Sequence, residues 1–195
     1  MNQHQEYEAD WWGTCVNTFS EEAKQITYAY NMGLLNVPDS YTGRWPQYDL
    51  GGKSVLDIGG GPTSILLKCV NFSRAVVVDP CPYPVWVRDR YTFHGVESVE
   101  TGGETFRTAE RFDEAWIYNV LQHVENPLAC LETAREHAKV LRIFEWIDTP
   151  PSLGHPHTIT KRLLDEFLGV TGSAAPFDGS SNGVYGRAYF GEYLL

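Results

Sequence analysis

Early in the chain a short apolar run leads directly into three glycines: Val55-Leu56-Asp57-Ile58-Gly59-Gly60-Gly61-Pro62-Thr63. The residues before the glycines are typical of a short buried strand. Glycine lets the backbone turn sharply and lets a ligand approach without a Cβ in the way. We therefore expect a strand, a tight turn and then a helix over residues 63–72, whose first N–H groups would donate hydrogen bonds to a carboxylate or phosphate.

A second apolar run ends at an acidic residue. Residues 75–78 read Ala-Val-Val-Val, which is typical of a strand covered on both faces, and Asp79 follows directly. Asp79 lies 22 residues after Asp57. An acid at the end of a second strand can accept hydrogen bonds from both ribose hydroxyls of a nucleoside. Together, the glycine turn and Asp79 predict a nucleoside site rather than a plain strand–helix turn.

Strands and helices alternate along the rest of the chain. Further strands are expected at residues 91–96, 114–118 and 139–146, and helices at 84–90, at 127–138 after the capping pair Asn126-Pro127, and from Thr160 to Gly169. From about residue 170 the tail predicts two strands joined by a Gly/Ser/Asn-rich segment. This alternation predicts an α/β fold with a doubly wound, mostly parallel, seven-stranded sheet.

The amino-terminal part of the chain has a different pattern. The first ten residues look loosely ordered, and the apolar patch Trp11-Trp12-Gly13 is too short to form an element. A helix is expected from an N-cap at Ser20 to about residue 36, and residues 38–53 are expected to form a loop. We therefore divide the chain into a helical extension or lid, residues 1–50, and a ligand-binding domain, residues 51–195.

Composition limits the classes of partner. Fifteen basic and 25 acidic residues give a net charge of −10, and the basic residues are scattered. Such a surface repels phosphate backbones and anionic membranes, which argues against nucleic-acid and membrane partners. The four cysteines lack metal-site spacing, the amino terminus has no apolar targeting stretch, and no run is long enough to span a membrane. We expect a cytoplasmic protein with reduced thiols; its oligomeric state is left open.

The glycine pattern disfavours a dinucleotide. A site for NAD or FAD favours G-x-G-x-x-G/A, whereas Ser64 occupies the third position here. Pro62 also lacks an N–H group in the turn that would bind a pyrophosphate.

Three segments instead resemble the class I S-adenosylmethionine-dependent methyltransferases: Val-Leu-Asp-Ile-Gly-Gly-Gly-Pro at 55–62, Val-Val-Val-Asp at 76–79, and Phe-Asp-Glu-Ala-Trp-Ile-Tyr-Asn-Val-Leu-Gln-His-Val at 112–124. The resemblance covers roughly residues 50–195. The chain departs from the common family pattern at Thr63, where that pattern has a third glycine. The resemblance implies the family's fold and S-adenosyl-L-methionine as cofactor.

The resemblance also implies roles for individual residues. The turn Gly59, Gly60 and Gly61 would lie against the methionyl and ribose parts of the cofactor, and Asp79 would hold the ribose. Asp57 would bind the cofactor's amino group, directly or through water.

Three more positions would face the cofactor. An acidic residue after the third strand would meet the adenine amino group. We prefer Glu104 to Glu97 for this role, because Gly102-Gly103 frees the loop before Glu104. Asn119 and Val120 would line the cofactor at the end of the fourth strand.

The candidate catalytic residue is His123. Methyl transfer needs an acceptor aligned about 3–3.5 Å from the methyl group, and a base helps if the acceptor carries a proton. His123 follows the fourth strand on the ligand side, and histidine titrates near neutral pH. A purely structural histidine is the competing interpretation.

Four residues are candidates for binding the acceptor: Trp11, Trp12, Glu145 and His155. The tryptophans could cover the site or merely anchor their segment to the core. His155 and His157 have a spacing that a metal could use, but no third ligand is evident, so we expect no metal site.

The predicted function is methyl transfer to a small molecule, because the surface is acidic and no appended nucleic-acid module is visible. Two alternatives stay open: methylation of nucleic acid or protein, and a non-catalytic module that binds S-adenosylmethionine.

Overall fold

A computed structural model describes residues 3–34, 36–37, 47–177 and 186–195. Its main sheet has seven strands in the spatial order β6-β5-β3-β7-β8-β10-β9. Their bounds are β3 Ser54–Ile58, β5 Arg74–Asp79, β6 Glu97–Glu100, β7 Phe112–Tyr118, β8 Ala138–Trp146, β9 Ser173–Pro176 and β10 Arg187–Leu194. Residues 178–185, in which the predicted turn of the tail falls, lie outside the described residues.

The sheet is mostly parallel. Strands β6, β5, β3, β7 and β8 run in one direction, and β10 pairs antiparallel with both β8 and β9. The chain fills the sheet outward from β3 to β6 on one side and from β7 to β8 on the other. This confirms the predicted fold class, and it puts the topological switch point at the carboxyl ends of β3 and β7, where ligands of such sheets bind.

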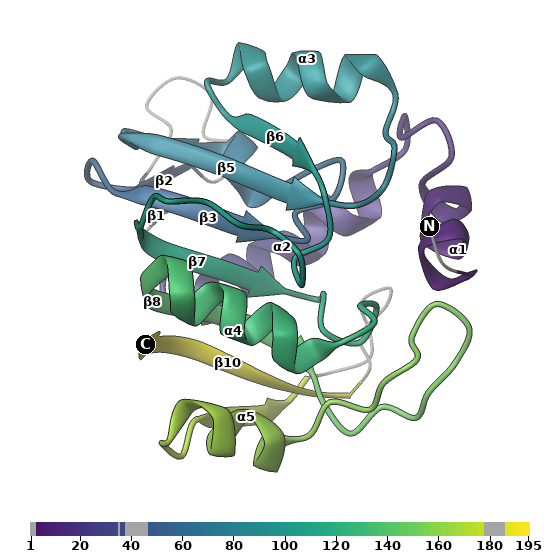
Figure 1. Cartoon of the computed structure of the whole chain (residues 1–195), viewed down its shortest axis with the longest axis vertical. Helices are drawn as coiled ribbons and strands as arrows, with labels where there is room; N and C mark the ends of the chain where they lie inside the picture. Colours follow the sequence, from purple (N-terminus) through teal and green to yellow (C-terminus); the bar gives the residue numbers. More distant parts are fainter. Residues whose placement is uncertain (1–2, 35, 38–46, 178–185) are drawn as a thin grey trace.

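Each face of the sheet has its own core. Helices α2 (Phe19–Asn31) and α3 (Val85–Phe93) pack on one face, and α4 (Pro127–His137) and α5 (Lys161–Leu168) on the other (Figure 1). Because side chains alternate along a strand, Val55 belongs to the first core and Leu56 to the second. Helix α2 thus shares a core with the sheet, although it lies within residues 1–50.

Two predicted helices begin and end as the sequence suggested. The Asn126 side chain accepts a hydrogen bond from the Ala129 N–H at 3.1 Å, with Pro127 at the first helical position of α4. The Thr160 hydroxyl accepts one from the Leu163 N–H at 3.2 Å, and α5 stops at Gly169, which has a left-handed backbone.

The expected helix over residues 63–72 is wrong. The chain forms only a 3₁₀ helix, η1 (Ile65–Lys68), and then the short strand β4 (Cys69–Val70). The cause is non-local: β4 pairs in parallel with β2 (Gln47–Asp49), which also pairs with β1 (Asn36–Val37), in a second, three-stranded sheet. Part of the predicted loop 38–53 is therefore strand, and residues 38–46 lie outside the described residues.

Three other predicted boundaries need correction. Residues 91–96 are not a strand, because α3 continues to Phe93 and buries Tyr91, so the third strand is β6. The first residues are not loose: Gln3–Trp12 form helix α1. The second helix begins at Phe19, after Thr18, and ends at Asn31 rather than near residue 36.

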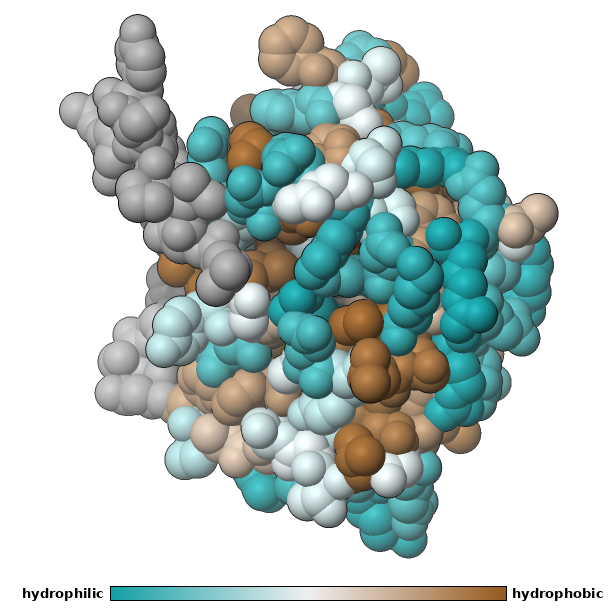
Figure 2. Space-filling view, turned by 90° about the vertical axis from the view of Figure 1, so that its left-hand side faces the viewer, coloured by the Kyte–Doolittle hydropathy of each residue, from teal (hydrophilic) through white to brown (hydrophobic). Residues whose placement is uncertain are grey.

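The two ends of the parallel strands face different surroundings. Helix α1 lies at the end toward which the arrows of β3, β5 and β7 point (Figure 1). Figure 2 views the opposite end, where hydrophilic side chains cover much of the surface between smaller apolar groups. Among the described residues, no helix is long and apolar enough to cross a bilayer.

Candidate functional site

A cavity of about 330 Å³ opens at the carboxyl ends of β3, β5 and β7. Residues of α1 and α2 form part of its wall, together with the loops that follow the three strands. The predicted site residues on this wall are Trp11, Trp12, Gly59, Gly60, Gly61, Asp79, Glu104, Asn119, Val120, His123 and His155. The structure therefore gathers most of the predicted residues, from distant parts of the sequence, around one space.

The glycine turn is packed too tightly for side chains. Gly59 has φ +75°, and a Cβ there would lie 2.6 Å from the methyl groups of Val120. A Cβ on Gly60 would lie 2.6 Å from Oδ2 of Asp57. Glycine is thus required both for the turn and for the close approach of the neighbouring loop.

The amide groups after the turn are already bonded within the protein. The Ser64 N–H donates to the Tyr91 hydroxyl at 2.9 Å, and the Ile65 N–H donates to the Tyr118 hydroxyl at 3.1 Å. Both tyrosines are buried. The expectation that these amides bind a carboxylate or phosphate is therefore wrong, since buried hydroxyls saturate them and η1 is a single short turn.

Asp57 lies beneath the turn and not on the cavity wall. Its Oδ2 accepts hydrogen bonds from the Ser64 hydroxyl and, at 2.6 Å, from the Tyr118 hydroxyl. Its Oδ1 has no hydrogen-bond partner among the described residues. Burial raises the pKa of Asp57 to about 7, although these hydrogen bonds oppose the shift. The geometry gives Asp57 a supporting place, and its predicted contact with the cofactor's amino group stays a prediction.

Asp79 lies on the wall at the end of β5. Its Oδ2 accepts a hydrogen bond from the Gly61 N–H at 3.1 Å, and its Oδ1 accepts one from the Cys81 N–H at 3.0 Å. Burial raises its pKa, while hydrogen bonds from Cys81, Tyr83 and Gly61 act in the opposite direction. Backbone hydrogen bonds thus fix the Asp79 carboxylate beside the glycine turn, as binding of a ribose would require.

The structure separates the two candidate glutamates. Glu104 lies on the cavity wall, and its Oε1 accepts a hydrogen bond from the Glu125 N–H at 3.0 Å. Glu97 begins β6 at the far end of the sheet and pairs with Arg74 at 2.9 Å. Of the two, only Glu104 is placed to meet a ligand of the cavity.

A buried acid holds the turn after β7. Asn119 has φ +58°, which asparagine tolerates better than most residues. Oε1 of Glu145 accepts hydrogen bonds from the Val120 N–H at 2.9 Å and the Leu121 N–H at 3.2 Å. Glu145 is fully buried, and burial raises its pKa to about 7. The prediction that Glu145 contacts the acceptor is corrected: it supports the Asn119–Val120 turn from behind and does not line the cavity.

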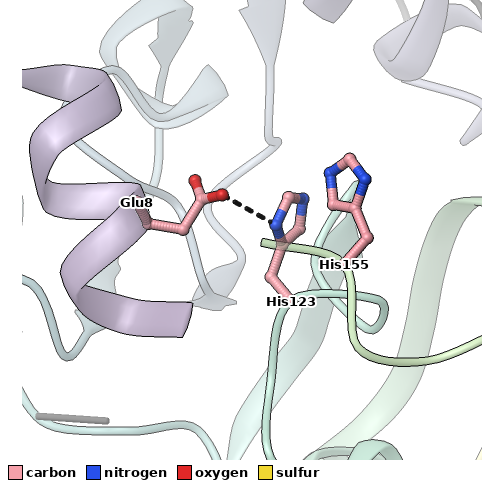
Figure 3. A group of neighbouring side chains, drawn as sticks. All are labelled: Glu8, His123 and His155. Atoms are coloured by element: carbon pink, nitrogen blue, oxygen red, sulfur yellow. Dashed lines mark ion pairs between the residues drawn. The ribbon is translucent and has the colours of Figure 1, made fainter. Parts of the chain in front are cut away.

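His123 lies on the cavity wall, and two oxygen atoms contact the same nitrogen of its ring. Its Nδ1 is 2.9 Å from the Gly154 carbonyl oxygen and 3.1 Å from Oε1 of Glu8, which projects from α1 (Figure 3). Burial opposes protonation of the imidazole. The hydrogen bond and charge of Glu8 and the charge of Glu145 outweigh it and raise the pKa of His123.

His155 packs edge-on against His123, with ring centroids 4.4 Å apart. Burial and the neighbouring His123 lower its pKa to about 4, so His155 is neutral at physiological pH. Glu8, His123 and His155 each offer one ligand atom within 4.8 Å of the others, a group that does not include His157. The pair His155 and His157 that the spacing suggested is thus not the cluster that forms.

Several wall residues were not anticipated from the sequence. They include Tyr7, Glu8, Glu21, Gln25, Tyr83, Tyr118, Ser152 and Leu153. One signal was available: Glu8, Trp11 and Trp12 have the i, i+3, i+4 spacing of one helix face. That spacing would have predicted a helix at the amino terminus, with one face toward the site.

Comparison with known proteins identifies the fold. No protein-family model and no curated protein matches the sequence. Among solved structures, the N-methyltransferase NodS from Bradyrhizobium japonicum WM9 in complex with S-adenosyl-L-homocysteine is 16% identical, with a TM-score of 0.66 over 99% of this chain and 98% of that one. Magnesium protoporphyrin IX methyltransferase from Synechocystis PCC 6803 with bound S-adenosylmethionine is 13% identical, with a TM-score of 0.62 over 100% and 98%.

A third solved structure also matches most of both chains. It is 1,6-didemethyltoxoflavin-N1-methyltransferase from Burkholderia thailandensis, 16% identical, with a TM-score of 0.60 over 100% of this chain and 90% of that one. The chain therefore has the fold of the class I S-adenosylmethionine-dependent methyltransferases.

Proposed function

We propose that this protein is an S-adenosylmethionine-dependent methyltransferase that methylates a small molecule by in-line displacement. One observation carries the proposal: in a methyltransferase fold, the glycine turn, Asp79 and His123 line a single cavity at the switch point of the sheet. When bound, the cofactor supplies a methyl group made electrophilic by a positive sulfur. The protein's task is to bind, align and exclude water.

The residues of the cavity fit this cofactor. A volume of about 330 Å³ lies within the range of small-molecule pockets, roughly 300–1,000 Å³. Gly61 faces the open space, since a Cβ built there meets nothing closer than Trp12 at 3.8 Å. Asp79 would hold the ribose, Glu104 the adenine amino group, and Asn119 and Val120 would line the opposite wall.

The acceptor end of the site is formed by α1 and the loop after β8. Trp11, Trp12 and His155 are on the cavity wall there, and the indole of Trp11 is 69% exposed. Within the proposed extension, residues 1–50, helix α1 would act as the cover that excludes water during transfer. His123, at the same end, would take the proton that the acceptor loses.

A small acceptor agrees with the charge and with the matched structures. The net charge of −10 disfavours nucleic acid, and two of the matched structures are named as N-methyltransferases, one of them with bound 1,6-didemethyltoxoflavin. A cytoplasmic location is part of the proposal: all four cysteines are described, buried, and form no disulfide.

The first experiment compares ligands by thermal shift and calorimetry. S-adenosylmethionine and S-adenosylhomocysteine should stabilise the protein, whereas NAD and FAD should not. Asp79→Ala should weaken binding of S-adenosylhomocysteine at least about tenfold, because it removes charge-assisted hydrogen bonds to the ribose. The control Asp89→Ala removes an exposed acid on nearby α3 and should leave binding unchanged.

The outcomes separate the competing functions. No stabilisation by either sulfur compound would contradict the proposal. A metabolite screen with the labelled cofactor then tests the acceptor. Tight cofactor binding without turnover on any small molecule would favour the non-catalytic module, and turnover on RNA or protein alone would favour a macromolecular acceptor.

A further inference from the structure

His123 is the one predicted catalytic residue, and a carboxylate from a distant part of the chain contacts it. Glu8 belongs to α1, which begins more than a hundred residues earlier in the sequence. Its Oε1 lies 3.1 Å from Nδ1 of His123, and the Gly154 carbonyl oxygen lies 2.9 Å from the same nitrogen (Figure 3). Both side chains of the pair are about one-fifth exposed, so water screens their interaction only in part.

These two contacts determine where the ring carries its proton. A carboxylate oxygen and a carbonyl oxygen are both hydrogen-bond acceptors, and neither can bond to a nitrogen lone pair. Nδ1 must therefore carry a hydrogen, so the lone pair of the neutral ring is on Nε2. The Gln122 side-chain nitrogen, which also donates to Oδ1 of Asn119 at 2.8 Å, lies 3.3 Å from Nε2 and would have to leave that lone pair before Nε2 takes a proton.

We propose that Glu8 is a positioning residue: its carboxylate fixes His123 with the proton on Nδ1 and Nε2 as the base for an acceptor that bears an N–H or O–H group. This inference rests on the proposed function. A carboxylate beside Nδ1–H holds the imidazole in the right tautomer and stabilises the imidazolium that forms when Nε2 takes a proton. In the reaction, the acceptor's lone pair bonds to the methyl carbon, the broken C–S bond leaves its electrons on sulfur, and the acceptor's proton passes to Nε2.

The helix that carries Glu8 is held against the same loop as His123. Tyr7, the preceding residue, packs so closely on Gly154 that a Cβ there would lie 2.6 Å from the tyrosine ring. Gly154 in turn provides the carbonyl oxygen that contacts Nδ1. The contacts that hold α1 over the cavity therefore also hold the two oxygen atoms against Nδ1 of His123.

The charged groups around His123 agree with this role. Glu8 faces it from α1, Glu145 from β8 and His155 from the loop after β8. Both acids raise the pKa of His123, whereas burial keeps His155 neutral. The hydrogen bond and the charge of Glu8 are the largest contributions that favour the protonated ring.

The same three residues could instead be considered metal ligands. The structure favours the ion pair, because Nδ1 is already shared by Glu8 and Gly154, and because the His123 ring lies between Glu8 and His155 in Figure 3. The three ligand atoms lie within 4.8 Å of one another, so it is the shared contact of Nδ1, and not their spacing, that favours the ion pair.

The test measures the titration of His123 directly and needs no acceptor. Imidazole signals are followed by NMR from pH 5 to 9 with S-adenosylhomocysteine bound, and His123→Gln identifies the relevant signal among the six histidines. Glu8→Gln should lower the pKa of His123 by about one unit, since an adjacent opposite charge is lost. Glu8→Asp should restore part of the shift. Glu6→Gln, an exposed acid on the same helix, should change nothing.

Kinetics complete the test once the screen yields an acceptor. Glu8→Gln should lower kcat roughly tenfold and move the acidic limb of the pH–rate profile to lower pH, with cofactor affinity within about twofold of wild type. An unchanged His123 pKa in Glu8→Gln would overturn the inference. So would binding of Zn²⁺ alone that Glu8→Gln and His155→Ala abolish. Failure of S-adenosylhomocysteine to bind would instead count against the proposed function.

Discussion

Buried carboxylates occur at both ends of the parallel strands, but their partners differ. At the amino end, Glu114 accepts hydrogen bonds from Nε of Arg142 at 2.7 Å, from Lys53 at 2.6 Å and from the Trp116 indole at 2.9 Å. Burial alone would raise the pKa of Glu114, yet these partners lower it below its usual value. The group is a closed network in which both carboxylate oxygens are paired.

At the carboxyl end the acids are left incompletely paired. Asp57 and Glu145 are fully buried, and each has one oxygen without a hydrogen-bond partner among the described residues. Burial raises the pKa of each to about 7. Since an unpaired buried oxygen is destabilising, its presence at the ends of β3 and β8, on either side of β7, marks the end of the sheet that serves function rather than stability.

The largest expected effect on stability comes from breaking the Glu114 network at the amino ends of the parallel strands. Arg142→Met removes the main partner of Glu114 and also a hydrogen bond to the carbonyl oxygen of Met32, the residue after α2. A buried carboxylate without its arginine should reduce the free energy of unfolding by about 3 kcal/mol or more, measured by chemical denaturation.

A matched control uses an exposed ion pair. Arg162 and Glu166 on α5 pair at 3.4 Å with side chains 85% and 65% exposed, so Arg162→Met should change stability by less than about 0.5 kcal/mol. Equal losses for the two variants would show that the Glu114 network does not differ from surface charge.

The next largest effect concerns ligand binding at the carboxyl ends of the strands. Gly60→Ala places a methyl group 2.6 Å from Oδ2 of Asp57 and 3.0 Å from Val77, so the turn must move. Because the turn lines the cavity, affinity for S-adenosylhomocysteine should fall about tenfold or more by calorimetry. Gly169→Ala, at a glycine outside the cavity with space for a Cβ, is the control: it should strain the end of α5 and leave the affinity unchanged.

Several features of the fold and of the site could be predicted from the sequence, because each depends on a local signal. The Ala-Val-Val-Val run, the caps Asn126 and Thr160, and the glycine turn followed by Asp79 are local signals, and the structure has each of them in its predicted element. Asp79 and the turn meet because parallel strands end together, which topology alone implies.

What the sequence did not predict depends on distant partners. Strand β4 exists because Cys69 pairs with Tyr48, and η1 is short for the same reason. Glu8 acquires its place only when α1 docks, and Glu145 sits in an apolar strand whose sequence does not show that its oxygen holds the turn after β7. Tertiary contacts of this kind leave no periodic trace in the chain.

A pH series should show opposite signs at the two ends. The folded pKa of Asp57 is raised to about 7, so the folded state binds its proton more tightly than the unfolded chain. Wild-type stability should therefore fall as pH rises from about 4 to 7, and Asp57→Asn removes that loss. Relative to wild type, the variant should gain about 2 kcal/mol between pH 5 and 8, measured by urea denaturation.

Asp113 at the paired end provides the contrast. Its hydrogen bonds with Lys139 and Ser54 lower its pKa to about 2, so its contribution is present above pH 4 and lost as pH falls toward 2. Asp113→Asn should therefore flatten the acid side of the stability curve and leave the range from pH 5 to 8 unchanged. The same sign for both variants would contradict the contrast between the two ends.

The smallest expected effect separates two adjacent tryptophans of α1. Trp11 is 69% exposed, whereas Trp12 packs against the core cluster that α2 shares with the sheet. Trp12→Ala should therefore cost about 1–2 kcal/mol of stability, and Trp11→Ala less than about 0.5 kcal/mol. Both indoles line the cavity, so Trp11→Ala should act on the acceptor, raising its KM with little change in cofactor affinity. Equal stability losses for the two variants would mean that both side chains anchor α1 to the core. That result would contradict a separate role for Trp11 in covering the cavity.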